Sequence, residues 1–334
     1  MNWCAMTTRE LALFTGSASE DLAAGIATEL CQPLGSSSTR RFPDGELAVT
    51  LDQPIRGQSV YIVQSMFPRV TESAFELLLF IDACRRAGAM HITAVVAYLG
   101  YARADKRHGR REAITASMLA QLLATAGLNR LVTVELHSPQ IEGFYPIPVE
   151  TLTAVPILSA EIKSCLSSAT VVVSPDEGRV QMAREFGSVL NLPVAVLHKI
   201  RASGTETKVL NVVGDVRGRP CLIIDDMITT GGTIANAVSA LLKAGASPDI
   251  TIAATHGVLV DGAREQLRHP AIRRIVVTDT IAQQDTGWPE LKVVSVAPLL
   301  AAAIRRLSDR KSASDLFNKD FSRSAIPLAS SLTD

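Results

Sequence analysis

An acid pair followed by a loop rich in threonine and glycine makes 221–233 (CLIIDDMITTGGT) the most informative segment. An apolar stretch typical of a buried strand runs into Asp225 and Asp226, and a helix-forming stretch follows the loop. Glycines let a backbone approach an anion closely, and amides at a helix start, with threonine hydroxyls, can bind phosphate. Two carboxylates beside such a loop suit vicinal sugar hydroxyls or a hydrated Mg²⁺. The plain alternative, a surface turn whose threonine caps a helix, leaves the acids and glycines unexplained.

A second strand-to-helix loop occupies 170–184 (TVVVSPDEGRVQMAR). Pro175 ends a β-branched strand because proline cannot donate to a sheet, so Asp176 stands at the carboxyl end of that strand. Ligands of open α/β sheets bind beyond these carboxyl ends. Asp176 is therefore a candidate to hold a metal ion or a hydroxyl group.

Four further polar segments could take part in chemistry. His137 follows a predicted strand, although a lone histidine is most often structural. The segment 99–115 is rich in lysine and arginine and could be a solvated basic loop, and 41–46 (RFPDGE) could be an ordinary hairpin turn. A polar segment after another strand is expected to form a mobile flap, with Lys199 and Arg201 on one face of an extended chain.

The elements that must position these residues alternate between strand and helix almost throughout. Short apolar runs separated by helices of ten or more residues indicate parallel sheets with right-handed crossovers. Two such series predict an α/β fold with two similar domains, 1–152 and 153–317, each a mainly parallel sheet flanked by helices, and a tail at 318–334. The predicted strands are 59–65, 91–99, 131–136, 170–174, 194–198, 220–225, 250–256, 274–279 and 293–296. The predicted helices are 72–87, 115–126, 181–189, 233–244 and 299–307.

Bulk composition narrows the class of protein. Hydrophobic residues make up 47% of the 334 residues and charged residues 20%, which is enough apolar material for sizeable cores. Basic and acidic residues each number 33, so the net charge is zero and there is no excess of positive charge that would indicate nucleic-acid binding. The N-terminus lacks a signal pattern, no apolar run reaches the ~20 residues of a membrane span, and five scattered cysteines suit reduced thiols. We therefore expect a cytoplasmic protein without nucleic-acid or membrane partners.

Two acids followed by a short threonine–glycine loop resemble the ribose-phosphate signature of the type I phosphoribosyltransferase fold. In the form beginning DDM, the segment is similar to that of the ribose-phosphate pyrophosphokinases, or PRPP synthetases, and the resemblance runs from about 11 to 317. It implies transfer of the pyrophosphoryl group of ATP to the C1 hydroxyl of ribose 5-phosphate, giving phosphoribosyl pyrophosphate (PRPP) and AMP. It also implies that the acids grip the ribose 2′- and 3′-hydroxyls and that the loop binds the 5-phosphate. The residues concerned are Asp225, Asp226, Thr229, Thr230, Gly231, Gly232 and Thr233.

The same resemblance implies roles for residues elsewhere in the chain. His137 and Asp176 are expected to ligate the Mg²⁺ that accompanies ATP, and Lys199 and Arg201 to close over the transferred group as catalytic residues. ATP is expected to contact a further set of residues, in which the Phe-Pro-Asp-Gly-Glu element comes from a neighbouring subunit of a homo-oligomer, a dimer or a hexamer. That set is Phe42, Asp44, Glu46, Arg103, Asp105 and His137.

The chain departs from the family pattern in two of these loops. Glu177 and Arg179 stand where the family usually has small residues (SPD-Ala-Gly-Gly), and Ala104 stands where glutamine is frequent. These changes leave open a catalytically weak regulatory homologue. The shared ribose-phosphate loop also leaves open a phosphoribosyltransferase, which would consume PRPP.

The allosteric anion site of phosphate-regulated family members is altered as well. The pattern S-x-S-x-L-F is kept at 312–317, but Pro139, Glu142 and Thr151 stand where small polar or amide groups are common. We therefore expect weak activation by phosphate and weak inhibition by ADP.

Overall fold

Contacts within the computed structural model divide the protein into two compact units. The structure describes residues 11–107, 109, 111–200, 209–283, 287–309 and 311. Unit 1 contains the chain up to Thr153, the short segment Thr280–Ala282 and the segment that begins at Ser295. Unit 2 contains Ala154–Asp279 and Gln283–Val294, so the chain enters each unit more than once.

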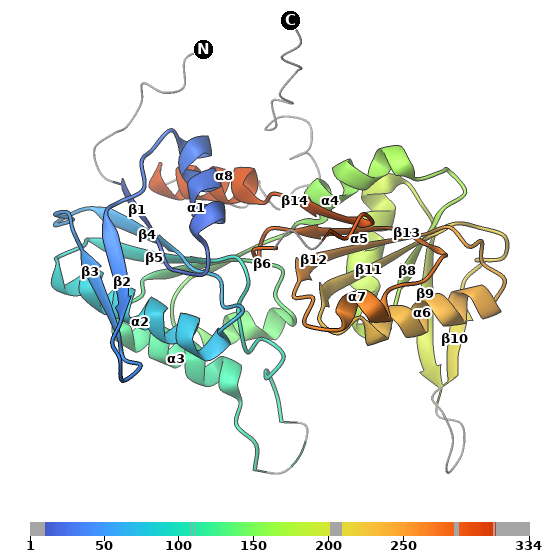
Figure 1. The fold of residues 1–334 in the computed structure, drawn as a ribbon, viewed down its shortest axis with the longest axis horizontal. Helices are drawn as coiled ribbons and strands as arrows, with labels where there is room; N and C mark the ends of the chain where they lie inside the picture. Colours follow the sequence, from blue (N-terminus) through green and yellow to red (C-terminus); the bar gives the residue numbers. More distant parts are fainter. Residues whose placement is uncertain are drawn as a thin grey trace, which may run out of the picture. The chain divides into compact units, whose positions relative to one another are not determined.

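Unit 1 is built on a five-stranded parallel sheet with the order β1-β4-β5-β6-β7. Its central strands are almost wholly buried because helices cover both faces, α1 and α8 on one and α2 and α3 on the other (Figure 1). The antiparallel hairpin β2–β3 contacts α2. The strands are β1 (Leu11–Thr15), β2 (Ser37–Arg41), β3 (Leu47–Leu51), β4 (Ser59–Val63), β5 (His91–Val96), β6 (Arg130–Val134) and β7 (Val149–Leu152). The helices are α1 (Glu20–Leu30), α2 (Val70–Arg86), α3 (Thr115–Ala126), the 3-10 helix η2 (Pro139–Phe144) and α8 (Ala297–Ser308).

The buried carboxylate of Glu76, on α2, ties the hairpin to the sheet. Glu76 is 1% exposed and accepts hydrogen bonds from the Ser17 hydroxyl (2.6 Å), the Thr39 hydroxyl (2.7 Å) and the Gln64 side-chain amide (2.7 Å). Ser17 follows β1, Gln64 follows β4, and Thr39 lies on β2. Because a buried charge is costly unless it is fully hydrogen-bonded, this network holds the hairpin against the carboxyl edge of the sheet.

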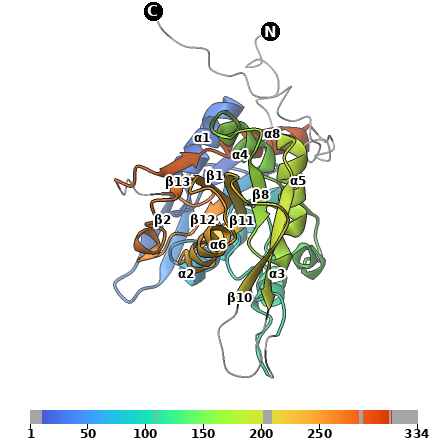
Figure 2. The ribbon, with the colours of Figure 1, turned by 90° about the vertical axis from the view of Figure 1, so that its right-hand side faces the viewer.

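Unit 2 is built on a seven-stranded sheet with the order β10-β9-β8-β11-β12-β13-β14. All neighbouring strands are parallel except β9 and β10, which form an antiparallel edge. α5 and α6 lie on opposite sides of the sheet (Figures 1 and 2). The strands are β8 (Val171–Ser174), β9 (Val194–Ile200), β10 (Val209–Val213), β11 (Cys221–Ile228), β12 (Ile250–Gly257), β13 (Ile272–Thr278) and β14 (Leu291–Val294). The helices are α4 (Val155–Ile162), η3 (Lys163–Cys165), η4 (Glu177–Arg179), α5 (Val180–Leu190), α6 (Gly232–Lys243) and α7 (Ala263–Gln266).

The predicted class, two similar α/β domains with mainly parallel sheets, is confirmed. One assignment is corrected, because the closing helix predicted to belong to the second domain is part of unit 1 as α8. There α8 packs on α1, Arg305 donates a hydrogen bond to the Glu29 carbonyl (2.7 Å), and the hydroxyls of Ser308 and Tyr61 lie 3.1 Å apart. Among the described helices, none combines the length and the apolar character needed to cross a membrane.

Candidate functional site

The acid pair lies on β11, just beyond the part of that strand that pairs with β8. β8 pairs with β11 from Cys221 to Ile223, whereas β12 stays paired with it as far as Ile228. The strand predicted to end at Asp225 therefore continues through both acids. Asp225 is 9% exposed and Asp226 2%, and each carboxylate accepts a 2.9 Å hydrogen bond from the backbone amide of the following residue.

Burial raises the pKa of Asp225 well above its ordinary value, because a buried carboxylate loses the water that stabilises its charge. Repulsion from Asp226 raises this pKa further, while the nearby guanidinium of Arg179 acts in the opposite direction. Two shielded carboxyl groups side by side suit a ligand with two adjacent neutral donors. A vicinal diol supplies such donors without bringing a third negative charge to the pair.

The loop after β11 needs a glycine at its end. Gly231 has φ 83°, in the left-handed region, and a Cβ there would lie 2.8 Å from Cγ of the buried Leu267. Both the backbone conformation and the available space therefore favour glycine. The residue brings the chain directly into α6, whose N-terminus carries unpaired amides and a positive partial charge.

Two threonine hydroxyls lie next to the start of α6. The Thr230 and Thr233 side chains are exposed, and Thr230 Oγ1 accepts a hydrogen bond from the Gly232 amide (3.4 Å). The loop is held by the Val260 amide, which donates to the Thr229 carbonyl (3.1 Å). Exposed hydroxyls and helix-start amides on a fixed backbone can bind a phosphate dianion. The structure thus brings all seven predicted ribose-phosphate residues together.

The second loop leaves β8 and turns tightly before α5. The Ser174 hydroxyl donates to the Asp176 carbonyl (2.6 Å), and Asp176 Oδ1 accepts from the Gly178 amide (2.9 Å). Asp176 is half-buried at the carboxyl end of β8, in the same unit as the acid pair.

Arg179 reaches from this second loop into the acid pair. Its Nε lies 3.4 Å from Asp225 Oδ1, and its Nη2 lies 3.1 Å from Asp226 Oδ2. The other charged residue of the loop, Glu177, is exposed and pairs with His198 on β9 (Oε1 to Nδ1, 2.8 Å). Sequence reasoning noted the unusual residues but missed both contacts. No sequence signal indicates them, because the order of the strands decides which of these loops meet.

The two predicted catalytic residues lie at the limit of the described chain. Lys199 belongs to β9, where it pairs with Leu210 of β10, so the segment predicted as a flap begins as a strand. Arg201 lies outside the described residues.

The predicted residues of the nucleotide side belong to unit 1. His137 follows β6 and precedes η2, and it is half-buried. Arg103 is exposed and Asp105 half-buried in the segment between β5 and α3. Between them, Ala104 donates to the Tyr101 carbonyl (2.8 Å) and accepts from the amide of Ala116 on α3 (3.2 Å). The small residue therefore contributes through its backbone, which fixes the turn that carries Arg103.

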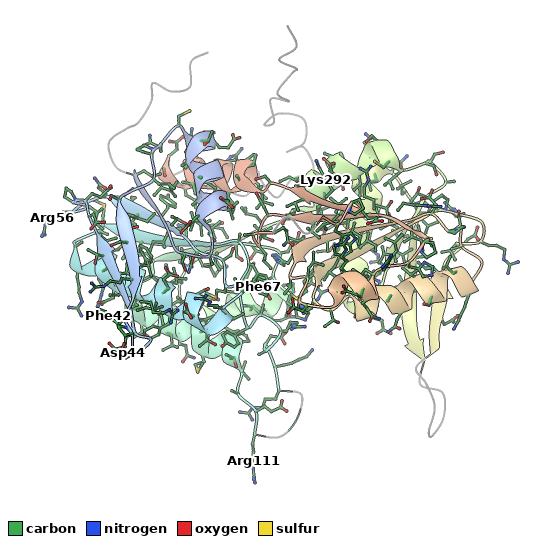
Figure 3. The ribbon with its side chains drawn as sticks, viewed as in Figure 1. Phe42, Asp44, Arg56, Phe67, Arg111 and Lys292 are labelled. Atoms are coloured by element: carbon green, nitrogen blue, oxygen red, sulfur yellow. The ribbon has the colours of Figure 1, made fainter. Side chains whose placement is uncertain are left out.

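The Phe-Pro-Asp-Gly-Glu element forms the tip of the β2–β3 hairpin, where Phe42 and Asp44 lie (Figure 3). The Phe42 amide donates to the Glu46 carbonyl (2.8 Å), and the Glu46 amide donates to Asp44 Oδ1 (3.1 Å). The guanidinium of Arg40 stacks 4.4 Å above the Phe42 ring. Asp44 and Glu46 are exposed and Phe42 is half-buried, so the element is ordered and accessible.

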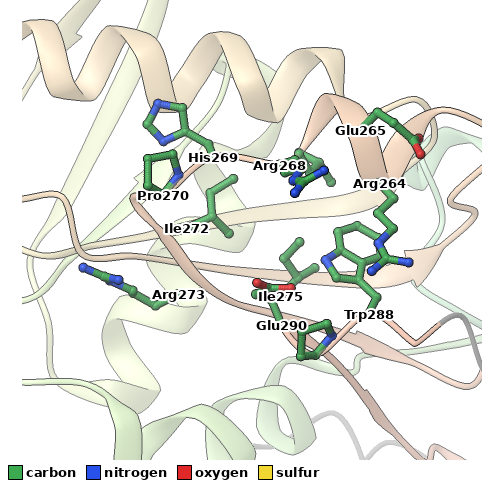
Figure 4. Close-up of a pocket in the computed structure, with 12 residues that line it drawn as sticks. Arg264, Glu265, Arg268, His269, Pro270, Ile272, Arg273, Ile275, Trp288 and Glu290 are labelled. Carbon is green, nitrogen blue, oxygen red and sulfur yellow. The ribbon is translucent and has the colours of Figure 1, made fainter.

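A cavity of about 930 Å³ lies elsewhere in unit 2, between α7 and the strands β13 and β14 (Figure 4). Leu267, Ile272 and Ile275 give it apolar walls, and Arg268 and Trp288 also line it. Its lining includes none of the predicted site residues, so we assign the chemistry to the two strand-end loops. Among the described residues, no group of three or more His, Cys, Asp or Glu side chains could hold a metal ion.

Comparisons with known proteins agree with one another. A family model described as the N-terminal domain of ribose phosphate pyrophosphokinase matches residues 11–127, and one described as the phosphoribosyl synthetase-associated domain matches residues 201–318. A ribose-phosphate pyrophosphokinase of Caldanaerobacter subterraneus subsp. tengcongensis is 43% identical over 312 residues, 93% of this chain and 98% of that protein. One of Corynebacterium glutamicum is 42% identical over 313 residues, 92% of this chain and 96% of that protein. The solved phosphoribosylpyrophosphate synthetase of Mycobacterium smegmatis matches with a TM-score of 0.85 at 41% identity, covering 90% of this chain and 100% of that one.

Proposed function

This chain belongs to the ribose-phosphate pyrophosphokinase family, and we infer that it transfers the pyrophosphoryl group of ATP to the C1 hydroxyl of ribose 5-phosphate. The products are PRPP and AMP. The observation that carries this inference is the buried acid pair on β11 directly before a threonine–glycine loop and the start of α6. Relatives named for this activity match over nine-tenths of the chain, which favours synthesis of PRPP over its consumption by a phosphoribosyltransferase.

In this proposal, the acid pair and the loop bind different parts of ribose 5-phosphate. Asp225 and Asp226 accept hydrogen bonds from the 2′- and 3′-hydroxyls, and the 5-phosphate binds the amides and hydroxyls of the loop. The loop residues are Thr229, Thr230, Gly231, Gly232 and Thr233. This division fits their burial, because neutral hydroxyls reach shielded carboxylates while the charged phosphate stays at the exposed helix start.

ATP is assigned to residues of unit 1. Arg103 and Asp105 line the triphosphate in this proposal, while Phe42, Asp44 and Glu46 of a neighbouring subunit contact the adenine. The accessible hairpin tip supports a shared site, because these side chains lie on a projecting hairpin with its own anchoring network. α2 and α3 also expose apolar side chains, Phe75 and Met118, which favours a homo-oligomer, either a dimer or a hexamer.

We propose Mg²⁺ as the cofactor, held by His137 and Asp176. One imidazole and one carboxylate are a sparse donor set, which suits Mg²⁺ because this ion keeps several waters and binds through substrate phosphates. When bound, the ion would neutralise charge on the polyphosphate of ATP. Asp176 can contribute because its second oxygen stays available while Oδ1 accepts from the Gly178 amide. We also propose a cytoplasmic location, where ATP and Mg²⁺ are present.

Pyrophosphoryl transfer depends on positioning and charge neutralisation. The C1 hydroxyl attacks the β-phosphorus of ATP in line, and AMP leaves. Lys199 and Arg201 are assigned to the charge that builds up on the transferred group, and Arg103 to the placement of ATP. Closure of the segment that carries Lys199 would exclude water and limit hydrolysis of ATP.

Regulation by phosphate is proposed to be weak. Glu142 accepts a hydrogen bond from the Thr151 hydroxyl (2.6 Å), so a carboxylate stands where the family's anion site would need donors. Activity should change little across a phosphate titration, and inhibition by ADP should be weak. A strong requirement for phosphate would contradict this.

A catalytically weak regulatory homologue is the second candidate, favoured by the guanidinium of Arg179 within the acid pair. AMP release from ATP and Mg²⁺, with and without ribose 5-phosphate, separates the two. An active synthetase releases AMP only with the sugar phosphate, and Lys199→Ala nearly abolishes it. Binding of either substrate without AMP release would favour the regulatory homologue.

A further inference from the structure

The guanidinium of Arg179 occupies the carboxylates that ribose is proposed to use. It contacts Asp225 at 3.4 Å and Asp226 at 3.1 Å, and all three side chains are at most 14% exposed. A cation shielded in this way is costly to leave without an anionic partner. A ligand that takes both carboxylates therefore has to displace this guanidinium from them.

Arg179 comes from a different loop than the acids it contacts. It ends η4 and is the N-terminal cap residue of α5, so its backbone belongs to the same loop as Asp176, which is proposed to hold the Mg²⁺ that accompanies the polyphosphate of ATP. The Gly178 amide is fixed by Asp176, and Glu177 is paired with His198. The loop before Arg179 is thus held in place, and α5 follows it directly, which leaves rotation of its long side chain as the simplest movement.

We propose that Arg179 couples the two halves of the substrate site by exchanging partners, binding Asp225 and Asp226 in the empty enzyme and the pyrophosphoryl group in the filled one. This inference rests on the proposed function and adds a positioning residue to it. Ribose hydroxyls and the guanidinium donate to the same carboxylate oxygens, so they compete. The hydroxyls carry no charge, so displacement of the guanidinium is favoured when a new anion is offered to it.

Pyrophosphate supplies that anion. A guanidinium binds phosphate oxygens through a planar fork of donors, which suits two adjacent phosphoryl groups better than a single point charge does. With pyrophosphate in the second loop, Arg179 leaves the acids and the hydroxyls take its place. Ribose 5-phosphate and pyrophosphate therefore strengthen each other's binding, and linkage makes the effect equal in both directions.

Calorimetric titration of the full chain with ribose 5-phosphate in Mg²⁺, with and without inorganic pyrophosphate, tests this coupling. Pyrophosphate should strengthen ribose 5-phosphate binding by roughly 5- to 150-fold in the wild type. In Arg179→Gln the effect should fall to within about twofold, and ribose 5-phosphate alone should bind more tightly because its competitor is gone. Arg184→Gln is the matched control, because it removes the same charge from an exposed position on α5 and should keep the full coupling.

Arg179→Lys keeps the charge without the forked geometry and should retain part of the coupling, which also covers the case in which Arg179→Gln fails to fold. Coupling absent from the wild type, or fully kept in either Arg179 variant, would overturn the proposal. Failure of the wild type to bind ribose 5-phosphate under any condition would instead contradict the proposed function, so the two failures are distinguishable.

Discussion

Burial makes the carboxyl group of Asp225 suited to binding a ligand, but the same burial is expected to lower the stability of the ligand-free fold. Folding buries this carboxyl group beside Asp226 and raises its pKa, so the folded chain holds a proton more tightly than the unfolded chain does. A group of this kind contributes its full stability below the unfolded pKa of about 3.9 and loses it as pH rises through the folded pKa. At neutral pH and without ligand, we therefore expect the ionised Asp225 to lower the free energy of unfolding.

Asp225→Asn should accordingly raise the free energy of unfolding at pH 8 by on the order of 1 kcal/mol, with a smaller gain near pH 4. Urea unfolding of the ligand-free protein at both pH values measures this. Asp261→Asn makes the same charge change at an exposed position and should have little effect at either pH. A less stable Asp225→Asn protein at pH 8 would mean that the ion pair with Arg179 outweighs the burial cost.

Gly231 offers a second test at the residue scale. Gly231→Ala adds both left-handed strain and a clash with Leu267, and it should destabilise the fold by roughly 1–3 kcal/mol. Gly262→Ala has a similar φ of 86° but nothing within 4 Å of the new Cβ, so strain alone should cost about 1 kcal/mol. Denaturant unfolding compares them, and equal losses would rule out the clash.

At the scale of elements, Glu76 is expected to decide how firmly the β2–β3 hairpin is held. In Glu76→Gln, one carboxylate oxygen that accepts hydrogen bonds is replaced by an NH₂ group that faces other donors. The free energy of unfolding should fall by about 1–3 kcal/mol. Backbone amide hydrogens of the hairpin should also exchange faster. Asp82→Asn makes the same kind of change on the same helix, at an exposed ion pair with Arg85, and should leave amide exchange in the hairpin unchanged. Hairpin exchange that is unchanged in Glu76→Gln would show that other contacts anchor it.

Elements with a strong apolar signal could be predicted, and those without one could not. β4, β5 and β11 are continuous apolar runs and were predicted, but β2 (SSTRR) has four exposed residues of five and no alternating pattern. α4 (VPILSAEI) is short and buried on nearly every side, so it lacks the helical period and is absent from the predicted helices.

The candidate site likewise contains features that the sequence predicts and one contact that it does not. The ribose-phosphate loop is contiguous in sequence, so its residue types alone indicated its chemistry. The contact of Arg179 with the acids joins two loops far apart in the chain, and residue types cannot state which distant loops meet. The register of β8 against β11 determines that meeting, and it is a property of the assembled sheet.

At the scale of the whole molecule, the proposed sharing of the ATP site predicts complementation between two inactive variants. Phe42→Ala keeps Lys199, and Lys199→Ala keeps Phe42, so a mixed pair of subunits restores one complete site. Equal mixing with subunit exchange should recover about a quarter of wild-type AMP release if the functional unit is a dimer. Each variant incubated alone is the control, and a mixture no more active than either variant would argue that each chain supplies its own adenine contacts.

The return of α8 to unit 1 has a consequence for how the protein is made. On the ribosome, α1 (Glu20–Leu30) emerges well before its packing partner α8 (Ala297–Ser308). At ~5–20 residues per second, the apolar side of α1 remains without α8 for roughly 15–55 s. Unit 1 therefore cannot complete its packing before α8 is made, and we expect newly made chains to need a chaperone on that surface until then.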